Sequence, residues 1–172
     1  MPDYRRLWVP GGTYFFTVAI ADRQTTLLTD RIDALREAFT EVRKSRSFQL
    51  DAIVVLPDHL HCLWTLPPDD AAFSVRWGQI KAAFSRRIPR DERRCPSRVA
   101  KRERGLWQRR YWEHLVRDEK EFWYCLDYIH YNPVKHGHVT RAMDWPHSSF
   151  RRWVARGVYL PDWATDPGAV RM

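Results

Sequence analysis

The sequence has little cysteine and no long apolar run, and each absence excludes a class of protein. Its three cysteines, Cys62, Cys95 and Cys125, are odd in number and scattered. They therefore indicate neither a disulfide framework nor a CxxC metal site, and they fit a reducing cytosol. The first residues lack an apolar signal-peptide core, and no run of about 18 apolar residues follows. We expect a cytoplasmic protein with neither a leader nor a membrane span.

Acidic residues are also scarce in one stretch of this 172-residue chain, whose net charge is +8. Residues 86–110 hold eleven Lys/Arg and three Asp/Glu, a net +8, and the remainder balances at eighteen of each sign (29 − 11 and 21 − 3). A local basic field of this kind suits a polyanion, most often nucleic acid. A solvated loop is the alternative.

The hydrophobic patterns predict an α+β fold. Alternating or β-branched segments predict strands at 13–20, 48–56, 59–66 and 111–116. Helical spacing predicts helices at about 30–45, 73–88 and 119–131, the first capped by Asp30, and a short basic helix within 138–157. Residues 89–106 read as a loop. This order predicts a ferredoxin-like (RRM-like) antiparallel β-sheet with packed helices. We expect one domain over residues 1–157, with the basic loop of about 86–110 inside it, and an irregular tail at 158–172.

Two histidines, His59 and His61, occupy alternate positions of the predicted strand 59–66. Side chains alternate faces along a strand, so both imidazoles point the same way, while Leu60, Cys62 and Trp64 point the opposite way. Paired neutral imidazoles can form half of a site for a divalent metal. Taken alone, such a pair is more often two satisfied strand residues.

The helix after Asp118 places two further polar residues on one flank of its apolar stripe. Asp118 followed by Glu121 resembles a capping box, and Pro133 predicts that the helix ends near Tyr131. Tyr128 and Asn132 are four residues apart and are therefore neighbours. A helical wheel places Tyr131 opposite the core, where we expect it to meet solvent or ligand.

Several motifs together resemble a known family, the REP-associated tyrosine transposases, which are single-tyrosine members of the HUH (His-hydrophobic-His) endonucleases and resemble insertion-sequence transposases. The resemblance covers about residues 4–153. Its motifs are YRR at 4–6, PGGTYFFT at 10–17, LPDHLH at 56–61, WQRRYWEH at 107–114, YIHYNPVKHG at 128–137 and WPHSSF at 145–150.

This resemblance implies a function and a site. The family cleaves and rejoins single-stranded DNA at hairpins of repetitive extragenic palindromes (REP/BIME-type repeats). It implies Tyr128 as the nucleophile that forms a 5′-phosphotyrosine. It also implies His59, His61 and Asn132 as ligands of Mg²⁺ or Mn²⁺, which polarises a non-bridging oxygen of the scissile phosphate. A monomer is expected, with a dimer as the alternative.

We assign DNA binding to basic residues of the 86–110 stretch and the N-terminal arm, because phosphate contacts need cations. The candidates are Arg5, Arg6, Arg86, Arg87, Arg93, Arg94, Arg109 and Arg110. Trp107 is a candidate for stacking on unpaired bases, as is Trp112, although core packing is the alternative for at least one of them. The HxH at residues 136–138 reads as surface, and the roles of His114 and His130 stay open.

Three other functions compete with this interpretation. A zinc hydrolase using His59, His61 and Cys62 is disfavoured because Cys62 points to the other face of the strand. A sequence-specific DNA-binding or regulatory protein of the same fold, with little or no strand transfer, would need the groove but no turnover. A ferredoxin-like RNA binder would fit the fold but would not need the HUH and tyrosine pair.

Overall fold

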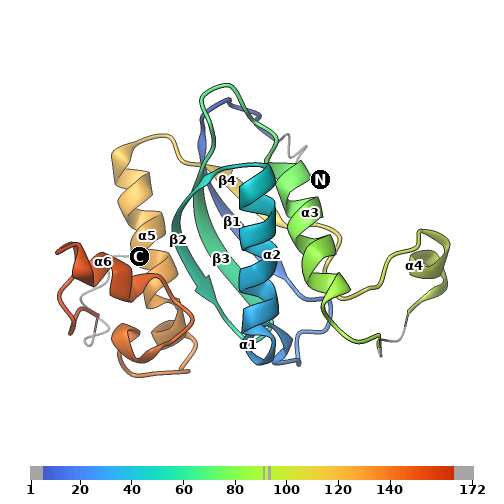
Figure 1. The fold of residues 1–172 in the computed structure, drawn as a ribbon. Helices are drawn as coiled ribbons and strands as arrows, with labels where there is room; N and C mark the ends of the chain where they lie inside the picture. Colours follow the sequence, from blue (N-terminus) through green and yellow to red (C-terminus); the bar gives the residue numbers. More distant parts are fainter. Residues whose placement is uncertain (1–5, 91, 93, 165–172) are drawn as a thin grey trace, which may run out of the picture.

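The computed structural model describes residues 6–164 except 91 and 93, and it contains one four-stranded sheet with helices on both faces (Figure 1). The strands are β1 Thr13–Ala19, β2 Gln49–Val55, β3 His59–Thr65 and β4 Trp112–Leu115. The helices are α1 Leu27–Asp30, α2 Ile32–Ser45, α3 Phe73–Arg86, α4 Pro96–Ala100, α5 Glu119–Lys135, η1 Ala142–Asp144 and α6 Phe150–Ala155.

The sheet has the order β2-β3-β1-β4, and each neighbouring pair is antiparallel. Strands β1 and β3 therefore lie at the centre of the sheet, and β2 and β4 form its two edges. The chain runs from β1 to β3 through α1, α2 and β2. This is the strand order of a split βαβ fold, which confirms the predicted ferredoxin-like α+β class. Figure 1 shows α2 and α3 on one face of the sheet and α5 on the other.

The two faces of the sheet bury different residues of the same strands. Leu60, Cys62 and Trp64 of β3 join the core under α2 and α3. Leu63 of β3 instead joins the core with Leu126 and other residues of α5. The two-residue period of a strand thus divides β3 between two cores, as its sequence predicted.

Helix α5 begins where the sequence predicted but ends later. The Asp118 side chain accepts a hydrogen bond of 2.8 Å from the Glu121 N–H, which caps the first turn. The expected end near Tyr131 is wrong, because the helix continues through Pro133 to Lys135. Asn132 and Pro133 are both buried, so packing offsets the single N–H that proline cannot donate.

Two smaller expectations also need correction. Asp30 does not cap a helix, because it is the last residue of α1 and the next helix, α2, begins at Ile32 without a side-chain cap. The stretch read as a loop at 89–106 contains α4, whose first residue, Pro96, suits the first helical turn. Within the described part of the chain, no helix is long and apolar enough to cross a membrane.

The motif at residues 145–150 extends the free edge of β2. The Val55 N–H donates to the His147 carbonyl at 2.8 Å, and the Ser149 N–H donates to the Ile53 carbonyl at 2.8 Å. The Trp145 indole N–H donates to the Val55 carbonyl at 3.0 Å. These bonds satisfy backbone groups that an open strand edge would leave to solvent. They also hold the segment after α5 against the sheet.

Candidate active site

The face of the sheet under α5 carries both histidines of the HUH motif. His59 and His61 are buried, at 7% and 4% exposure, and their ring centroids lie 5.0 Å apart. Cys62 lies in the other core, where burial raises the pKa of its thiol well above the usual range. A zinc site built from these three residues is therefore excluded by the alternation of β3.

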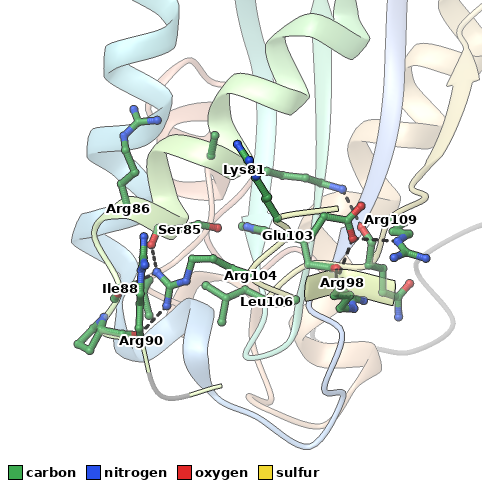
Figure 2. A pocket seen from close by; sticks show the side chains of 16 residues that line it. Lys81, Ser85, Arg86, Ile88, Arg90, Arg98, Glu103, Arg104, Leu106 and Arg109 are labelled. Atoms are coloured by element: carbon green, nitrogen blue, oxygen red, sulfur yellow. Dashed lines mark hydrogen bonds and ion pairs between the residues drawn. The ribbon is translucent and has the colours of Figure 1, made fainter. Parts of the chain in front are cut away.

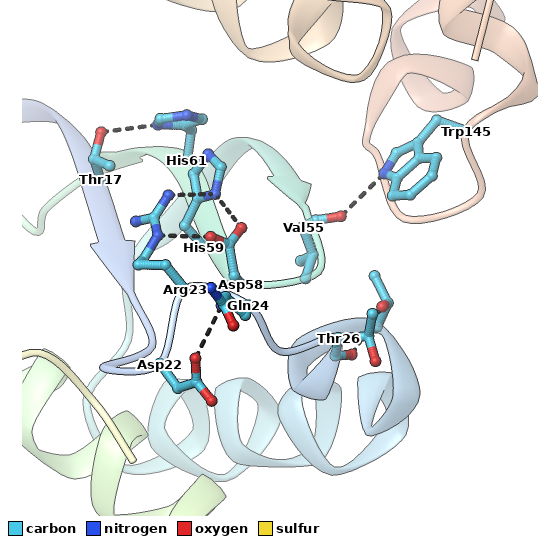
Figure 3. A network of polar contacts seen from close by, with 11 residues as sticks. Thr17, Asp22, Arg23, Gln24, Thr26, Val55, Asp58, His59, His61 and Trp145 are labelled. Carbon is cyan, nitrogen blue, oxygen red and sulfur yellow. Dashed lines mark hydrogen bonds and ion pairs between the residues drawn. The ribbon is translucent and has the colours of Figure 1, made fainter. Parts of the chain in front are cut away.

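Each histidine has its Nδ1 atom engaged by a neighbouring side chain (Figure 3). The Thr17 hydroxyl lies 2.8 Å from Nδ1 of His61, and the two residues are paired across β1 and β3. An Asp58 carboxylate oxygen lies 2.7 Å from Nδ1 of His59. With Nδ1 engaged, Nε2 of each ring is the nitrogen that remains to bind a ligand. Such partners orient imidazoles at metal sites.

Arg23 completes the contacts behind His59. Its Nε lies 2.6 Å from the second Asp58 carboxylate oxygen, and Nη2 lies 3.4 Å from Nδ1 of His59. Partial burial alone would raise the pKa of Asp58. The hydrogen bond with His59, the charge that His59 carries when protonated and the charge of Arg23 nevertheless lower this pKa. Asp58 is therefore a carboxylate at neutral pH, able to fix the His59 ring.

Both imidazoles are neutral at physiological pH. Burial, together with the repulsion that His59 and His136 exert when they are protonated, lowers the pKa of His61 to about 3. Burial also lowers the pKa of His59, although Asp58 acts in the opposite direction. A neutral imidazole keeps a lone pair on one nitrogen, which is the form that binds metals.

Tyr128 of α5 faces His61 across the packing boundary between helix and sheet. The two ring centroids are 5.3 Å apart and the rings are nearly perpendicular, at 76°. Phe15 of β1 supports the tyrosine from the side, with centroids 5.8 Å apart. Nζ of Lys135 lies 4.9 Å from the centroid of the Tyr128 ring. The structure thus brings Tyr128 next to the HUH strand and adds a cation beside it.

Asn132 lies on the same flank of α5 and is completely buried, at 0% exposure. Neither its Oδ1 nor its Nδ2 has a hydrogen-bond partner among the described residues. One turn before it, Tyr128 faces His61, and one turn after it, His136 lies with its ring centroid 5.5 Å from that of His59. Asn132 is therefore positioned between the two histidine contacts.

A buried amide without partners is costly unless another group satisfies it. No group of three His, Cys, Asp or Glu side chains forms a metal site anywhere in the described residues. Two imidazole Nε2 atoms and one amide oxygen nevertheless make a donor set that a divalent metal accepts. His59, His61 and Asn132 therefore fit such an ion.

Several contacts of the site were not predicted from the sequence. Thr17, Arg23 and Asp58 were missed, although Asp58 directly precedes His59 and could have been noticed as a partner for it. His136 is exposed, as predicted for a surface residue, but it also approaches His59. Only the packing of α5 on β3 brings the rings of His59 and His136 together.

Other residues of α5 have roles that differ from expectation. Tyr131 is buried, at 8% exposure, so the prediction that it meets solvent or ligand is wrong. The helical-wheel prediction took only one side of α5 to be covered, whereas the chain that follows α5 folds back along this helix and covers a second side (Figure 1). His130 is buried on that second side, and its Nε2 lies 2.9 Å from the Ser149 hydroxyl.

His114 belongs to β4, and its Nε2 lies 3.3 Å from a carboxylate oxygen of Glu121 in α5.

The basic stretch lines a cavity of about 970 Å³ next to α3 (Figure 2). Seven basic residues line it together with one acidic residue, Glu103: they are Lys81, Arg86, Arg90, Arg98, Arg102, Arg104 and Arg109. Their arrangement places most of the excess positive charge around one concave surface, which suits a polyanion.

The predicted DNA-binding arginines differ in how they are engaged. Arg86 and Arg87 pair with glutamates of α2, Arg109 pairs with Glu103, and Arg6 pairs with Glu113. Arg94 and Arg110 are exposed and have no ion pair within the described residues. Arg5 and Arg93 lie outside the described residues.

Trp107 is placed in the core rather than at the surface. It is 7% exposed, its ring meets that of Phe84 edge to face at 5.3 Å, and it belongs to the cluster under α3. Its burial removes the open ring face that stacking on a base requires. Trp112, in contrast, is 51% exposed.

Known proteins resemble this chain in sequence and in fold. The family model described as "Transposase IS200 like" matches residues 9–132. A REP-associated tyrosine transposase of Escherichia coli (strain K12) is 45% identical over 96% of this chain and 93% of its own length. A solved structure of a REP-associated tyrosine transposase bound to a REP hairpin superimposes with a TM-score of 0.82. It shares 43% identity and covers 100% of this chain and 98% of that one.

Proposed function

The chain belongs to the IS200-like transposase family, and from this premise we propose that it cleaves and rejoins single-stranded DNA at REP-type hairpins with Tyr128 as the nucleophile. One observation carries the proposal. The ring centroids of Tyr128 and His61 lie 5.3 Å apart, and one helical turn away lies the buried Asn132, whose amide has no hydrogen-bond partner among the described residues. The catalytic domain extends to about residue 157 and acts as a monomer.

The metal ligands are His59, His61 and Asn132, through the two Nε2 atoms and Oδ1. Members of this family generally use a divalent metal, and here we propose Mg²⁺ or Mn²⁺. When bound, the ion would polarise a non-bridging oxygen of the scissile phosphate. Thr17 and Asp58 fix the imidazole rings by their contacts with Nδ1. Their role is to keep the ligand atoms directed toward α5.

Tyr128 carries the covalent chemistry. Its phenolic oxygen attacks the phosphorus, the bond to the 3′ oxygen breaks, and the products are a 5′-phosphotyrosine and a strand with a free 3′-OH. Lys135 places a positive charge beside the nucleophile, with its Nζ 4.9 Å from the centroid of the Tyr128 ring. Because the phosphodiester energy is retained in the phosphotyrosine, attack by a 3′-OH restores the DNA strand without ATP.

DNA binding is assigned to the cavity lined by the basic stretch, together with Arg6, Arg94 and Arg110 at the surface. Support comes from the seven basic side chains that line about 970 Å³ beside α3. Phosphate contacts fix the position of the strand, and they predict binding that weakens steeply with salt. This binding would also hold the protein on the nucleoid.

The decisive experiment uses Tyr128→Phe and a labelled oligonucleotide that contains a REP-type hairpin and its single-stranded flank. We expect wild-type protein with Mn²⁺ to form a covalent DNA adduct that survives denaturing electrophoresis, and Tyr128→Phe to form none. Tyr131→Phe is the matched control and should retain the adduct, because Tyr131 lies three residues after Tyr128 on α5 and its ring is buried in packing. An adduct in Tyr128→Phe would refute the assignment.

The same experiment tests the alternative, a DNA-binding or regulatory protein with little strand transfer. That protein would bind the hairpin with the same salt dependence but would form no adduct even in the wild type. Binding measured by fluorescence anisotropy, beside the adduct assay, therefore separates the two functions.

A further inference from the structure

A second cavity, of about 550 Å³, opens directly beside Tyr128, between α5 and the β1–β4 side of the sheet. Tyr128 and Thr17 line it on the side of the HUH histidines, and Trp112, His114 and Tyr124 line its outer part. The space therefore begins at the proposed nucleophile and continues outward along β4. A nucleotide joined to a phosphate at Tyr128 would have this cavity within reach.

The walls of this cavity are aromatic and open to solvent. Trp112 is 51% exposed and Tyr124 is 49% exposed. The Trp112 indole lies parallel to the His114 ring, with an interplanar angle of 5° and centroids 5.7 Å apart. The Phe15 ring lies nearly perpendicular to the indole, at 70°, with the two centroids 5.7 Å apart. These contacts orient the indole while about half of its surface stays open.

Strand pairing makes this wall rigid. Trp112 is paired with Thr17 across β4 and β1, and Thr17 contacts His61 through its hydroxyl. The indole and the His61 ring are therefore both positioned against β1, from β4 on one side and from β3 on the other. Trp64 and Trp77, in contrast, are completely buried in the core under α3, so Trp112 differs from them in keeping part of its ring surface open.

The charge at the rim of the cavity identifies the kind of group that fits. The Glu121 carboxylate lies at the rim, held by the Arg117 N–H at 2.8 Å and by His114 at 3.3 Å. A carboxylate disfavours a phosphate of the DNA backbone, whereas a neutral heterocycle gains from aromatic stacking. Unpaired bases stack on aromatic side chains in proteins that bind single strands.

We infer that this cavity receives the unpaired base of a nucleotide adjoining the scissile phosphate and stacks it on Trp112. The inference rests on the proposed function, since it takes Tyr128 as the residue at that phosphate. Trp112 would then position the strand for attack while the basic cavity beside α3 binds phosphates elsewhere. Stacking of one base typically changes affinity by roughly 5- to 150-fold.

The test is a double-mutant cycle in the non-cleaving Tyr128→Phe protein. The oligonucleotide is the hairpin with its flank, either intact or with an abasic site at the nucleotide on one or the other side of the cleavage point. Trp112→Ala should weaken binding of the intact strand about 10-fold. It should have little effect on the strand whose abasic site removes the stacked base.

Two protein variants serve as controls. Trp112→Phe should recover most of the affinity, because it keeps a stacking ring. Trp123→Ala should leave binding unchanged, since Trp123 is a 39% exposed tryptophan of α5 that does not line the cavity. In the cleaving protein, Trp112→Ala should raise KM more than it lowers kcat.

Additive effects of Trp112→Ala and base removal at both positions would overturn the inference. So would full binding by Trp112→Ala. These outcomes differ from failure of the proposed function, in which the wild type would form no adduct with any hairpin strand. A 2-aminopurine base at the same two positions gives an independent measurement: its fluorescence should be quenched on binding by Tyr128→Phe but not by the Tyr128→Phe, Trp112→Ala double variant.

Discussion

The two faces of the sheet use the same strands for opposite purposes. Under α2 and α3, Phe16 of β1 packs against Trp64, with centroids 4.7 Å apart, and the surrounding residues are aromatic or aliphatic. Under α5, the preceding residue of the same strand, Phe15, packs beside His61 and Tyr128. One face contributes mainly burial of apolar surface, whereas the other keeps polar groups buried for chemistry.

This difference has a physical cost on the α5 face. His61 must remain neutral, and both polar atoms of Asn132 lack partners among the described residues. Buried polar groups of this kind destabilise a fold. The apolar core on the other face offsets that cost. The two faces should therefore respond to substitution in opposite ways, one in stability and the other in activity.

The largest expected effect is on stability, from Phe16→Ala. Phe16 is 0% exposed and contacts several aromatic rings, so its removal should lower the free energy of unfolding by about 3–5 kcal/mol. Chemical denaturation followed by circular dichroism measures this. Trp123→Ala, at an exposed site, should cost about 1 kcal/mol or less. Similar destabilisation of the two variants would contradict the assignment of the main core.

His61→Ala should give the reverse result. We expect DNA cleavage to fall about 10²- to 10³-fold, comparable to the removal of a main electrostatic interaction in other enzymes. Hairpin binding should change much less, and the free energy of unfolding should fall less than in Phe16→Ala. His59→Ala should behave similarly. Adduct formation and anisotropy, measured on the same protein samples, provide the check. Unchanged cleavage would exclude His61 from the site.

Asp58→Asn tests the hydrogen bond behind His59. Removing a carboxylate partner typically lowers metal affinity about 10- to 100-fold, and calorimetric titration with Mn²⁺ measures this without any DNA. Asp22→Asn is the matched control, because Asp22 lies in the same region but accepts a hydrogen bond from Gln24 instead (Figure 3). Equal affinities for both variants would show that Asp58 does not orient the ligand.

His130 should make the free energy of unfolding depend on pH, by about 2 kcal/mol. Burial lowers its pKa in the folded protein to about 3, below the usual value of about 6.5 in an unfolded chain. Acid therefore protonates the unfolded chain first, and stability that is complete above about pH 6.5 is lost as the pH falls toward about 3. Between about pH 7 and about pH 5 the contribution is about 2 kcal/mol. His130→Gln should flatten the pH dependence of the free energy of unfolding by that amount, and an unchanged slope would contradict it.

The smallest effect concerns surface arginines. Arg86 is paired with Glu41 between α2 and α3, so Arg86→Ala should change hairpin affinity less than Arg110→Ala, whose guanidinium is free of such pairs among the described residues. Removing one cation that neutralises a phosphate of single-stranded DNA should reduce the salt slope by about 0.7. Anisotropy at several salt concentrations measures the slope for each variant. A larger change for Arg86→Ala would mean that DNA displaces its glutamate.

Local patterns predicted much of the α5 face. The alternation in β3 put the two histidines on one side and Cys62 on the other, and the four-residue spacing put Tyr128 beside Asn132 on α5. The same wheel was wrong about Tyr131, because a wheel gives angles around a helix and not what covers each side. The helix end was also wrong, since the burial of Pro133 depends on neighbours distant in sequence.

The contacts that complete the site could not be predicted in this way. Thr17 meets His61 only through the register of β1 on β3, and Arg23 reaches Asp58 from the turn after β1. Trp107 and Trp112 belong to one motif, yet the first is buried and the second is exposed. Hydrophobicity alone does not distinguish them, because the difference is decided by which helix covers each side of the chain.

The sequence by itself determined the strand and helix periods, the ferredoxin-like order of elements, the basic stretch and the family. These properties follow from chemistry between residues close together in the chain. Tertiary structure alone decided that α5 lies over β3, which brings Tyr128 within 5.3 Å of His61 and leaves an aromatic cavity beside it. Packing between distant segments sets those distances, and such packing depends on the whole chain at once.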